Sequence, residues 1–566
     1  MENKELLEDS KLGFDFFFTK FPHVSWLQVL WFFLVNYCWV VGGLVQVGSI
    51  ILQATPEFRC KSALDERYRT NYAEGLVFSP EDSCSQYVNI ESLCSQNMTL
   101  ENCINEIEGK TASLEIEACS TGYIFDQSVF TRTVTTDYEL VCENAYIEST
   151  ISSIFFSGLF FGVFIFGPIC DKIGRTKASV IASCCLIVVQ IPLIFLPKSA
   201  GVWSYAVIRM ISGFFSISAG TGTFVYTMEI IGPKWRTWFG CVTQGIFAVG
   251  YALLSLVGYL IKDWQDQMIV LALAPVFVIP IFVYLPYSTA WIFSQKRYDD
   301  AKENVKLIGQ KYEIETEDKF LEQLEGSVKA QQKSDAGGKT YTQIDLLKPK
   351  KMRIITLVEM YQWFATTLVF YGLALGAGNL GSSLFISNFI NAMIDIVCYI
   401  LLPFFMDLKF IGRKWGTVWT MLLGSAGCFL TAVFDYLQNE YPDNGTYGTL
   451  KATCAFAGKF GVAGTFGIVY VHASEMFPTP VRGIGVGLSS AGGRIGGMVA
   501  PLINGLGNTT SWLPFVVFGA LGLLQVLTAF LLPETLGVPM LTTIEGAEEF
   551  YNNPEKFKKD AEEENN

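Results

Sequence analysis

Runs of about twenty apolar residues, separated by short polar breaks, recur along this chain from residue 26 to residue 533. That length is what an α-helix needs to cross the hydrocarbon core of a bilayer. Hydrophobic residues make up 51% of the 566 residues and charged residues 16%, so water cannot solvate this apolar surface. We predict an all-α membrane protein with twelve transmembrane helices. The runs are residues 26–53, 147–169, 177–197, 202–230, 237–261, 267–287, 354–376, 382–406, 415–435, 450–474, 483–506 and 511–533.

Lys and Arg are unequally divided between the two sets of short loops. Nine lie in the loops on one side of the membrane and three in the loops on the other. Cytoplasmic loops carry the excess of positive charge, so residues 1–25 and the tail, residues 534–566, are both expected to be cytoplasmic. No cleavable signal peptide is expected, because the first 25 residues are mixed in character and the first apolar run is too long.

Residues 54–146 form a long polar insertion that this topology places on the outer side. It contains six cysteines, an even number in an oxidising compartment, which predicts three disulfides among fifteen possible connectivities. Three Asn-x-Ser/Thr sequons fall in outer loops, at Asn97, Asn444 and Asn508, and are candidate glycosylation sites. The cysteines are Cys60, Cys84, Cys94, Cys103, Cys119 and Cys142.

Two charged patterns each occur twice in the chain. A Gly-Arg turn with a preceding Asp follows runs two and eight at a spacing of 238 residues, and Glu-x6-Arg ends runs four and ten at a spacing of 246 residues. Recurrence at nearly one offset indicates an internal duplication. We predict two six-helix halves, residues 26–287 and 354–533, joined by a charged cytoplasmic linker, residues 288–353. The repeated charges are Asp171, Arg175, Glu229, Arg236, Asp407, Arg413, Glu475 and Arg482.

These eight charges lie at helix ends on the predicted cytoplasmic side. Opposite charges there can pair across the halves when that side is closed and separate when it opens. Partly exposed pairs are worth about 1 kcal/mol or less each, which keeps them breakable. We interpret them as an inner gate; the alternative is a set of static, solvated ion pairs that only mark topology.

The segment GPICDKIGR at residues 167–175 resembles the loop signature of the major facilitator superfamily. The Cys-rich loop after ATPEFRC (54–60), the segment SEMFPTPVRGIGV (474–486) and PETLG (533–537) narrow the resemblance. Together they are similar to the organic cation, anion and zwitterion (carnitine) transporter family. One departure is PYSTAW at residues 286–291, where the family usually has PESPRW, so a Glu and an Arg of the usual cytoplasmic charge network are missing at that corner.

The resemblance implies the major facilitator fold and secondary transport by alternating access, with no enzymatic activity, cofactor or metal. A duplicated six-plus-six plan places the substrate site between the halves. It further implies a multi-pass protein of the plasma membrane that carries a small organic ion across the lipid bilayer, with sodium, a proton or a counter-substrate as candidates for coupling. No nucleic-acid partner is expected, since the net charge is −13 and no basic run occurs.

Five charged residues fall inside the predicted membrane spans. Asp395 and Arg494 lie about twelve or thirteen residues into their runs, which puts both near the bilayer midplane. Charges at that depth face a bundle interior or a water-filled path, so these two are expected to pair or to share one cavity. Glu359 lies near the cytoplasmic face, where it could simply reach water. Arg209 and Lys459 are rough counterparts in runs four and ten.

Arg494 bears most directly on the substrate. The resemblance implies an acidic residue at this position in cation carriers and Arg in anion and carnitine carriers. A dehydrated guanidinium grips a carboxylate bidentately and repels a bare cation. Asp395 then remains for an ammonium group or as the resting partner of Arg494. Tyr399 stands where anion carriers of the family tend to have Lys, which makes a zwitterion as plausible as a plain anion.

Aromatic side chains are expected to line the rest of the site, since they suit flat or quaternary organic solutes. For each ring alone, ordinary helix packing is the competing interpretation. The rings proposed for binding are Phe224, Trp363, Phe370, Tyr371 and Tyr399.

Three other functions compete with carboxylate transport. An organic cation carrier would use Asp395 and the aromatic rings. A sugar facilitator shares the PETLG-like ending, but is expected to have a short first outer loop and a glutamine-rich seventh span. A non-transporting receptor would use the large outer loop to bind its ligand. Flux in sealed vesicles separates the carriers from the receptor.

Overall fold

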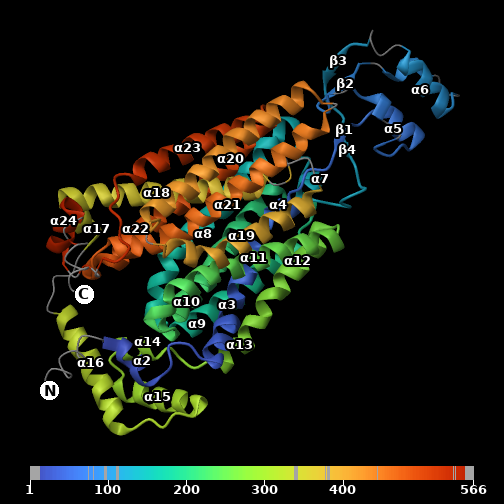
Figure 1. The fold of residues 1–566 in the computed structure, drawn as a ribbon. Helices are drawn as coiled ribbons and strands as arrows, with labels where there is room; N and C mark the ends of the chain where they lie inside the picture. The colour runs from blue at the N-terminus through green and yellow to red at the C-terminus, as the bar shows by residue number, and fades with distance from the viewer. Residues whose placement is uncertain are drawn as a thin grey trace.

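The computed structural model describes residues 13–73, 76–80, 82–88, 90–94, 98–109, 114–336, 342–376, 378, 383–408, 410–442, 444–538, 541, 543–554 and 557. Long helices form two bundles, with a small outer domain at one end and short helices at the other (Figure 1). Twelve membrane crossings, in two groups of six, agree with the sequence-based prediction. Within the described residues, ten crossings are long and apolar enough to span by composition alone; the Gly- and Arg-containing α22 and the 17-residue α23 complete the set.

The N-terminal half begins after a capping box at Ser25, whose side chain accepts a hydrogen bond from the backbone of Gln28. Its last crossing bends through a 3-10 turn that contains Pro275. The crossings are α3 (Trp26–Gln46) with α4 (Ser49–Leu52), α8 (Ala145–Ile173), α9 (Arg175–Ile194), α10 (Val202–Ile230), α11 (Arg236–Leu260), and α12 (Trp264–Leu273) with η8 (Ala274–Phe277) and α13 (Val278–Tyr284).

The C-terminal half repeats this order of helices. Its crossings are α18 (Lys350–Leu375), α19 (Leu384–Met406), α20 (Lys414–Glu440), α21 (Gly445–Met476), α22 (Arg482–Gly505) and α23 (Leu513–Ala529). The glycines of both Gly-Arg turns have a positive φ, 98° at Gly174 and 64° at Gly412. Glycine adopts that conformation without strain, which explains why each charged turn is built on Gly-Arg.

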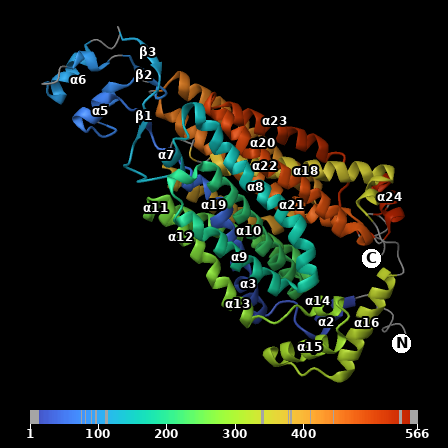
Figure 2. The same cartoon turned by 180° about the vertical axis from the view of Figure 1, so that it is seen from behind.

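The two halves meet through α8 with α22 and α11 with α19. In both views their helices converge beside the outer domain and diverge toward the chain termini (Figures 1 and 2). Several contacts join the halves at the end that carries the outer domain, so the protein is closed at that end and splayed at the end that carries the chain termini. Examples are Tyr371 with Gln46, Asn388 with Ser255, Tyr251 with the Ala374 carbonyl and Tyr259 with Phe385.

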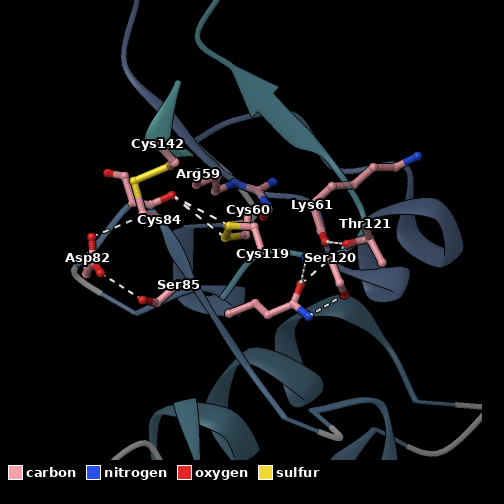
Figure 3. The surroundings of a disulfide bond; sticks show 12 residues. Arg59, Cys60, Lys61, Asp82, Cys84, Ser85, Cys119, Ser120, Thr121 and Cys142 are labelled. Atoms are coloured by element: carbon pink, nitrogen blue, oxygen red, sulfur yellow. Dashed lines mark hydrogen bonds between the residues drawn. A yellow bond between two sulfur atoms is a disulfide. The ribbon is translucent and has the colours of Figure 1, made fainter. Parts of the chain in front are cut away.

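The outer domain is held by three disulfides, as its six cysteines predicted. The pairs are Cys60–Cys119, Cys84–Cys142 and Cys94–Cys103. The first two lie side by side (Figure 3), and the Cys119 backbone N–H donates to the Cys84 carbonyl. Two short antiparallel pairs complete the domain with α5 (Ala63–Tyr68), α6 (Leu100–Glu108) and α7 (Val134–Tyr138): β1 (Phe58–Cys60) with β4 (Tyr123–Phe125), and β2 (Ser85–Tyr87) with β3 (Ile116–Ala118).

Short helices cover the ends of the bundles opposite the outer domain. The linker contains α14 (Thr289–Ser294), α15 (Tyr298–Tyr312), α16 (Asp318–Ala336) and α17 (Gln343–Leu347), and α2 (Phe17–Lys20) follows the 3-10 turn η1 (Gly13–Phe16) near the N-terminus. The tail helix α24 (Ile544–Asn552) buries Phe550 and Tyr551 against α18 and the ends of α21 and α22. The remaining 3-10 turns are Leu76–Phe78, Ile90–Leu93, Cys142–Asn144, Lys198–Ala200, Pro233–Trp235, Thr479–Val481 and Leu506–Asn508.

Candidate substrate site and cytoplasmic charge network

Arg494 lies halfway along α22 and is half-buried. Its Nε is buried and has no hydrogen-bond partner among the described residues, while its side chain interacts with the Tyr470 hydroxyl of α21. The backbone of α22 is held close to α18, because a Cβ at Gly492 or Gly496 would collide with carbonyl oxygens of that helix. This close packing fixes the depth of Arg494 and leaves part of its guanidinium available.

Aromatic rings from both halves surround this position. Trp363 packs on Tyr470 with ring centroids 4.3 Å apart, and Phe370 packs on Phe466 at 4.9 Å. The N-terminal half adds two rings: Phe224 lies 6.3 Å from Tyr470, and Phe156 lies 4.7 Å from Tyr371.

Four of the five rings proposed from the sequence therefore gather in one cluster. Its other members, Phe156, Phe466 and Tyr470, were missed by the sequence analysis. The signal for two of them was present, since Phe466 and Tyr470 stand at i and i+4 of one helix and therefore share a face.

Asp395 is not paired with Arg494 in this conformation. Its partner is Lys459 of α21, whose Nζ lies 3.2 Å from Asp395 Oδ2, and neither side chain has any exposed surface. The Lys459 ammonium also lies 3.2 Å from the ring centroid of Phe370. Because α19 and α21 pack together within one half, the two opposite charges neutralise each other there. Asp395 consequently faces no aqueous cavity in this conformation.

Tyr399 and Arg209 are packed into the protein at the edges of the aromatic cluster, Tyr399 near Tyr470 and Arg209 on Phe155, the neighbour of Phe156. Tyr399 is 2% exposed and lies between α19, α11 and α21, beside Gly245 and Gly467. Arg209 is 1% exposed, donates to the Val45 carbonyl at 3.2 Å and stacks on Phe155 at 4.4 Å. Both side chains are buried and make packing contacts in this conformation.

Glu359 does not reach water, contrary to the expectation from its depth. It is completely buried between α18 and α21, where Nδ1 of His472 lies 3.5 Å from its Oε1. The tail helix α24 covers this end of α18 and shields the carboxyl group. The hydropathy pattern gave the position of Glu359 near one end of α18. It could not predict that the tail helix α24 covers that end.

The cytoplasmic corner of the N-terminal half is a connected network. Arg175 lies 2.9 Å from Asp171 and 3.1 Å from Glu229, and the Ser288 hydroxyl donates to the same Glu229. The indole of Trp291 donates to the Asp171 carbonyl at 2.7 Å and packs against Gly174. The network therefore forms although the family's usual Glu and Arg are missing after Pro286.

The C-terminal corner repeats this network and extends it. Arg413 lies 3.1 Å from Asp407 and 3.2 Å from Glu475, and the Thr535 hydroxyl donates to Glu475 at 2.6 Å. In addition, Glu534 accepts hydrogen bonds from the backbone N–H groups of Arg413 and Lys414 at 2.9 and 3.0 Å.

The arginines of the two Glu-x6-Arg patterns do not pair with the glutamates that precede them. Arg236 forms an ion pair with Asp15 at 2.6 Å and donates to the carbonyl five residues before it. Arg482 donates equivalently to the Phe477 carbonyl. Each ion pair described at the two corners lies within one half.

An outer cavity of about 1080 Å³ lies between the outer domain and the outer ends of α4, α8, α18, α19 and α22. Among its described lining residues are four carboxylates and no Lys, Arg or His. The described lining is therefore acidic. The carboxylates are Glu57, Asp126, Glu143 and Glu148.

Two of the three sequon asparagines lie among the described residues. Asn97 lies outside the described residues. Asn444 and Asn508 are both exposed, at the start of α21 and after α22, and Asn508 lines the outer cavity. Glycosylation at the three asparagines remains a prediction.

Comparison with known proteins agrees with this architecture. The family described as "Sugar (and other) transporter" matches residues 116–545. "Organic cation transporter 1" of Caenorhabditis elegans is 31% identical over 78% of this chain and 73% of its own length. The chain belongs to the organic ion transporter family of the major facilitator superfamily.

Other relatives cover nearly the whole chain of this organic ion transporter. An "Organic cation transporter protein" of Drosophila melanogaster is 29% identical over 96% of both chains, and human "Organic cation/carnitine transporter 2" is 28% identical over 92% of this chain and 91% of its own. Among solved structures, the partially occluded inward-open form of the E. coli xylose transporter XylE has a TM-score of 0.60 at 14% identity, over 90% of this chain and 100% of that chain. That likeness confirms the fold.

Proposed function

We propose that this transporter is a plasma-membrane carrier, with both termini in the cytoplasm, for small organic anions or zwitterions that bear a carboxylate, such as carnitine. The proposal rests on how the charged side chains near the bilayer midplane are paired. Asp395 and Lys459 neutralise each other, whereas Arg494 keeps an unpaired Nε beside aromatic rings from both halves.

The substrate would bind between the two halves. The guanidinium of Arg494 would hold the carboxylate, because a planar fork suits a bidentate carboxylate contact. Trp363 and Tyr371 would contact the other end, where ring faces can accept a quaternary or protonated amine, whereas the Phe370 ring already carries the Lys459 ammonium. Phe224 and Phe156 of the N-terminal half would close the site from the opposite wall.

Alternating access would use the two cytoplasmic corners as an inner gate. Each corner is complete within its own half in this conformation. When the cytoplasmic side closes, Arg175 and Arg413 would exchange part of these contacts for contacts across the halves. Such partly exposed pairs are weak enough to break in each cycle.

Parallel uptake of three labelled solutes tests the proposal. Carnitine, an aromatic monoanion and tetraethylammonium are supplied to cells or proteoliposomes containing the protein, each with and without a sodium gradient. We expect carnitine or the anion to be carried best. Preferred uptake of tetraethylammonium would overturn the carboxylate assignment, and bound ligand without flux in sealed vesicles would indicate a receptor.

An organic cation carrier is the second candidate, and the outer cavity favours it. Four carboxylates without a basic residue among the described lining would concentrate cations at the outer entrance. The same field would admit a zwitterion through its ammonium end and disfavour a plain anion. Within the proposed class, the cavity therefore favours zwitterions over simple anions.

A further inference from the structure

The buried contact between Glu359 and His472 has no role in the transport scheme above. Glu359 comes from α18 and His472 from α21, and their side chains are 0% and 2% exposed. They lie near the cytoplasmic ends of these helices, within one half. His472 is one of only two histidines in the chain, the other being His23.

The geometry fixes where one hydrogen of the His472 ring must be. Nε2 lies 3.2 Å from the carbonyl oxygen of Pro533. A carbonyl oxygen only accepts hydrogen bonds, so Nε2 must carry a hydrogen and donate it. The other ring nitrogen, Nδ1, faces Glu359 Oε1 at 3.5 Å. In a neutral ring this Nδ1 is an acceptor.

A proton on one of the two side chains is favoured. A neutral Nδ1 and an ionised carboxylate would place two acceptors 3.5 Å apart while both side chains are buried. One proton relieves this repulsion, either on the carboxyl group or on Nδ1, and at this separation neither Glu359 oxygen forms a hydrogen bond within the described part of the chain. In both forms the pair as a whole is neutral, and loss of the proton leaves one buried negative charge.

The groups around the pair do little to stabilise that negative charge. Neither Glu359 oxygen has a hydrogen-bond partner among the described residues. Tyr551 of α24 lies near Glu359, but its hydroxyl donates to the Met476 carbonyl. The remaining charged groups that act on His472 are Glu475, Glu534 and Arg413 of the C-terminal corner.

We propose that Glu359 and His472 form a one-proton site that exchanges with the cytoplasm and makes transport depend on cytoplasmic pH. Proton loss adds one negative charge beside Glu475 and Glu534, which hold Arg413 in the corner that must rearrange during transport. The site would therefore connect protonation to gating. This connection rests on the proposed transport function, whereas the proton site itself does not.

Nuclear magnetic resonance of the purified full-length protein, labelled with 15N-histidine, tests the site without any substrate. Only two residues contribute ring signals, and His23→Asn assigns them. We expect Glu359→Gln to change the Nδ1 signal of His472, because the amide replaces a group that shares a proton with the ring, while Nε2 keeps its hydrogen. Identical His472 ring signals in the two proteins would overturn the shared-proton site.

Uptake at a fixed outer pH and varied inner pH tests the connection to transport. Proteoliposomes carry whichever of the three solutes the protein accepts. We expect the parent rate to vary with inner pH by up to about tenfold per unit, the limit for one proton, and Glu359→Gln to reduce this to less than about twofold. His23→Asn should keep the parent profile.

The two experiments separate the possible failures. An unchanged pH profile in Glu359→Gln, or loss of pH dependence in His23→Asn, would contradict the gating role. If none of the three solutes is carried, the proposed function fails while the resonance experiment still decides the proton site.

Discussion

The two halves of this transporter have kept the same cytoplasmic corner but have diverged inside the membrane. In each corner an Arg pairs with an Asp and a Glu, and a hydroxyl donates to that Glu, from Ser288 in one half and Thr535 in the other. Within its membrane-spanning helices, the C-terminal half supplies Asp395, Lys459, Glu359, His472 and Arg494, whereas the N-terminal half supplies Arg209 and aromatic rings.

The difference separates two requirements of a duplicated carrier. The proposed inner gate must open and close symmetrically, which accounts for the corner geometry that both halves share. Recognition of a charged solute needs fixed polar groups on only one wall, because the opposite wall can contribute ring faces and shape. We therefore expect changes in the C-terminal interior to affect folding and substrate choice, and changes at the corners to affect rate.

Removing one partner of the buried pair should have the largest effect on stability. Lys459→Met leaves the Asp395 carboxylate buried without a counter-charge, which typically costs about 3–5 kcal/mol. We expect a much lower melting temperature in detergent, and recovery of most of the loss in Asp395→Asn with Lys459→Met. Lys306→Ala, which breaks an exposed pair with Asp318, is the control and should change little. A Lys459→Met protein as stable as the parent would mean that Asp395 has another partner.

Asp137 anchors the outer domain to the N-terminal half, and the stability of this anchor should decrease in acid. Burial raises the pKa of Asp137, but hydrogen bonds from Arg132, Lys198 and Trp264 outweigh it and lower the pKa overall. A lowered folded-state pKa gives stability that is present above the unfolded value, about 3.9, and is lost as the pH falls through the folded value. Asp137→Asn should remove roughly 1–3 kcal/mol and most of this acid sensitivity.

Hydrogen exchange of residues 132–138 at decreasing pH measures the anchor. In the parent, protection of these amides relative to their intrinsic exchange rates should decline as the pH falls below about 3.9, the unfolded pKa of Asp, toward the lower folded pKa of Asp137. In Asp137→Asn the protection should be low already at neutral pH. Equal exchange in both proteins would mean that Asp137 does not anchor residues 132–138. Lys451 and Asp435 pair at 2.6 Å on the outer side of the C-terminal half, so Lys451→Ala is the matched control and should leave residues 132–138 unchanged.

Transport turnover should depend on a carboxylate after the sixth crossing of each half more strongly in the C-terminal corner, which has Glu534, than in the N-terminal corner, which has Tyr287. Glu534 accepts the backbone N–H groups of Arg413 and Lys414, while Tyr287 occupies the corresponding position after Pro286. Glu534→Gln weakens charge-assisted hydrogen bonds worth about 1.5–3 kcal/mol each, so we expect a several-fold slower turnover. Tyr287→Glu should alter turnover less. Initial rates at saturating substrate measure both, and equal effects would remove the asymmetry.

The smallest effects are expected at the exposed ends of the gate. The Asp171 side chain is 74% exposed, so Asp171→Asn should slow transport only slightly. Arg482→Ala should slow it more, because this guanidinium donates to the Phe477 carbonyl at a helix junction. Neither change should alter the apparent affinity much. A large loss of affinity with unchanged turnover would place either residue in the substrate site.

The sequence predicted the elements of this structure better than their contacts. Apolar run length fixed the twelve crossings, the even number of cysteines predicted three disulfides, and the repeated Gly-Arg pattern located both corners. Which helix face meets which neighbour depends on packing between distant segments. The Asp395–Lys459 pair and the burial of Glu359 under α24 therefore could not be predicted from depth alone.

The sequence also could not predict which partners the corner charges have in this conformation. Charges at the corners were compatible with pairing within a half or across the halves, and in the proposed cycle the same residues do both. The structure shows the pairing within each half. The contribution of Tyr470 could have been recognised from its i, i+4 spacing to Phe466, which gives α21 an aromatic face.

Uptake by a series of Arg494 variants tests the central claim most directly, with surface expression measured in parallel. We predict that Arg494→Ala weakens the apparent affinity for a carboxylate solute about ten- to a hundredfold, as loss of a charge-assisted contact implies. Arg494→Lys should recover only part, since an ammonium keeps the charge without the fork, and Arg494→Asp should shift preference toward cations. If all three variants carry the anion or zwitterion as well as the parent does, Arg494 is structural and the substrate assignment is wrong.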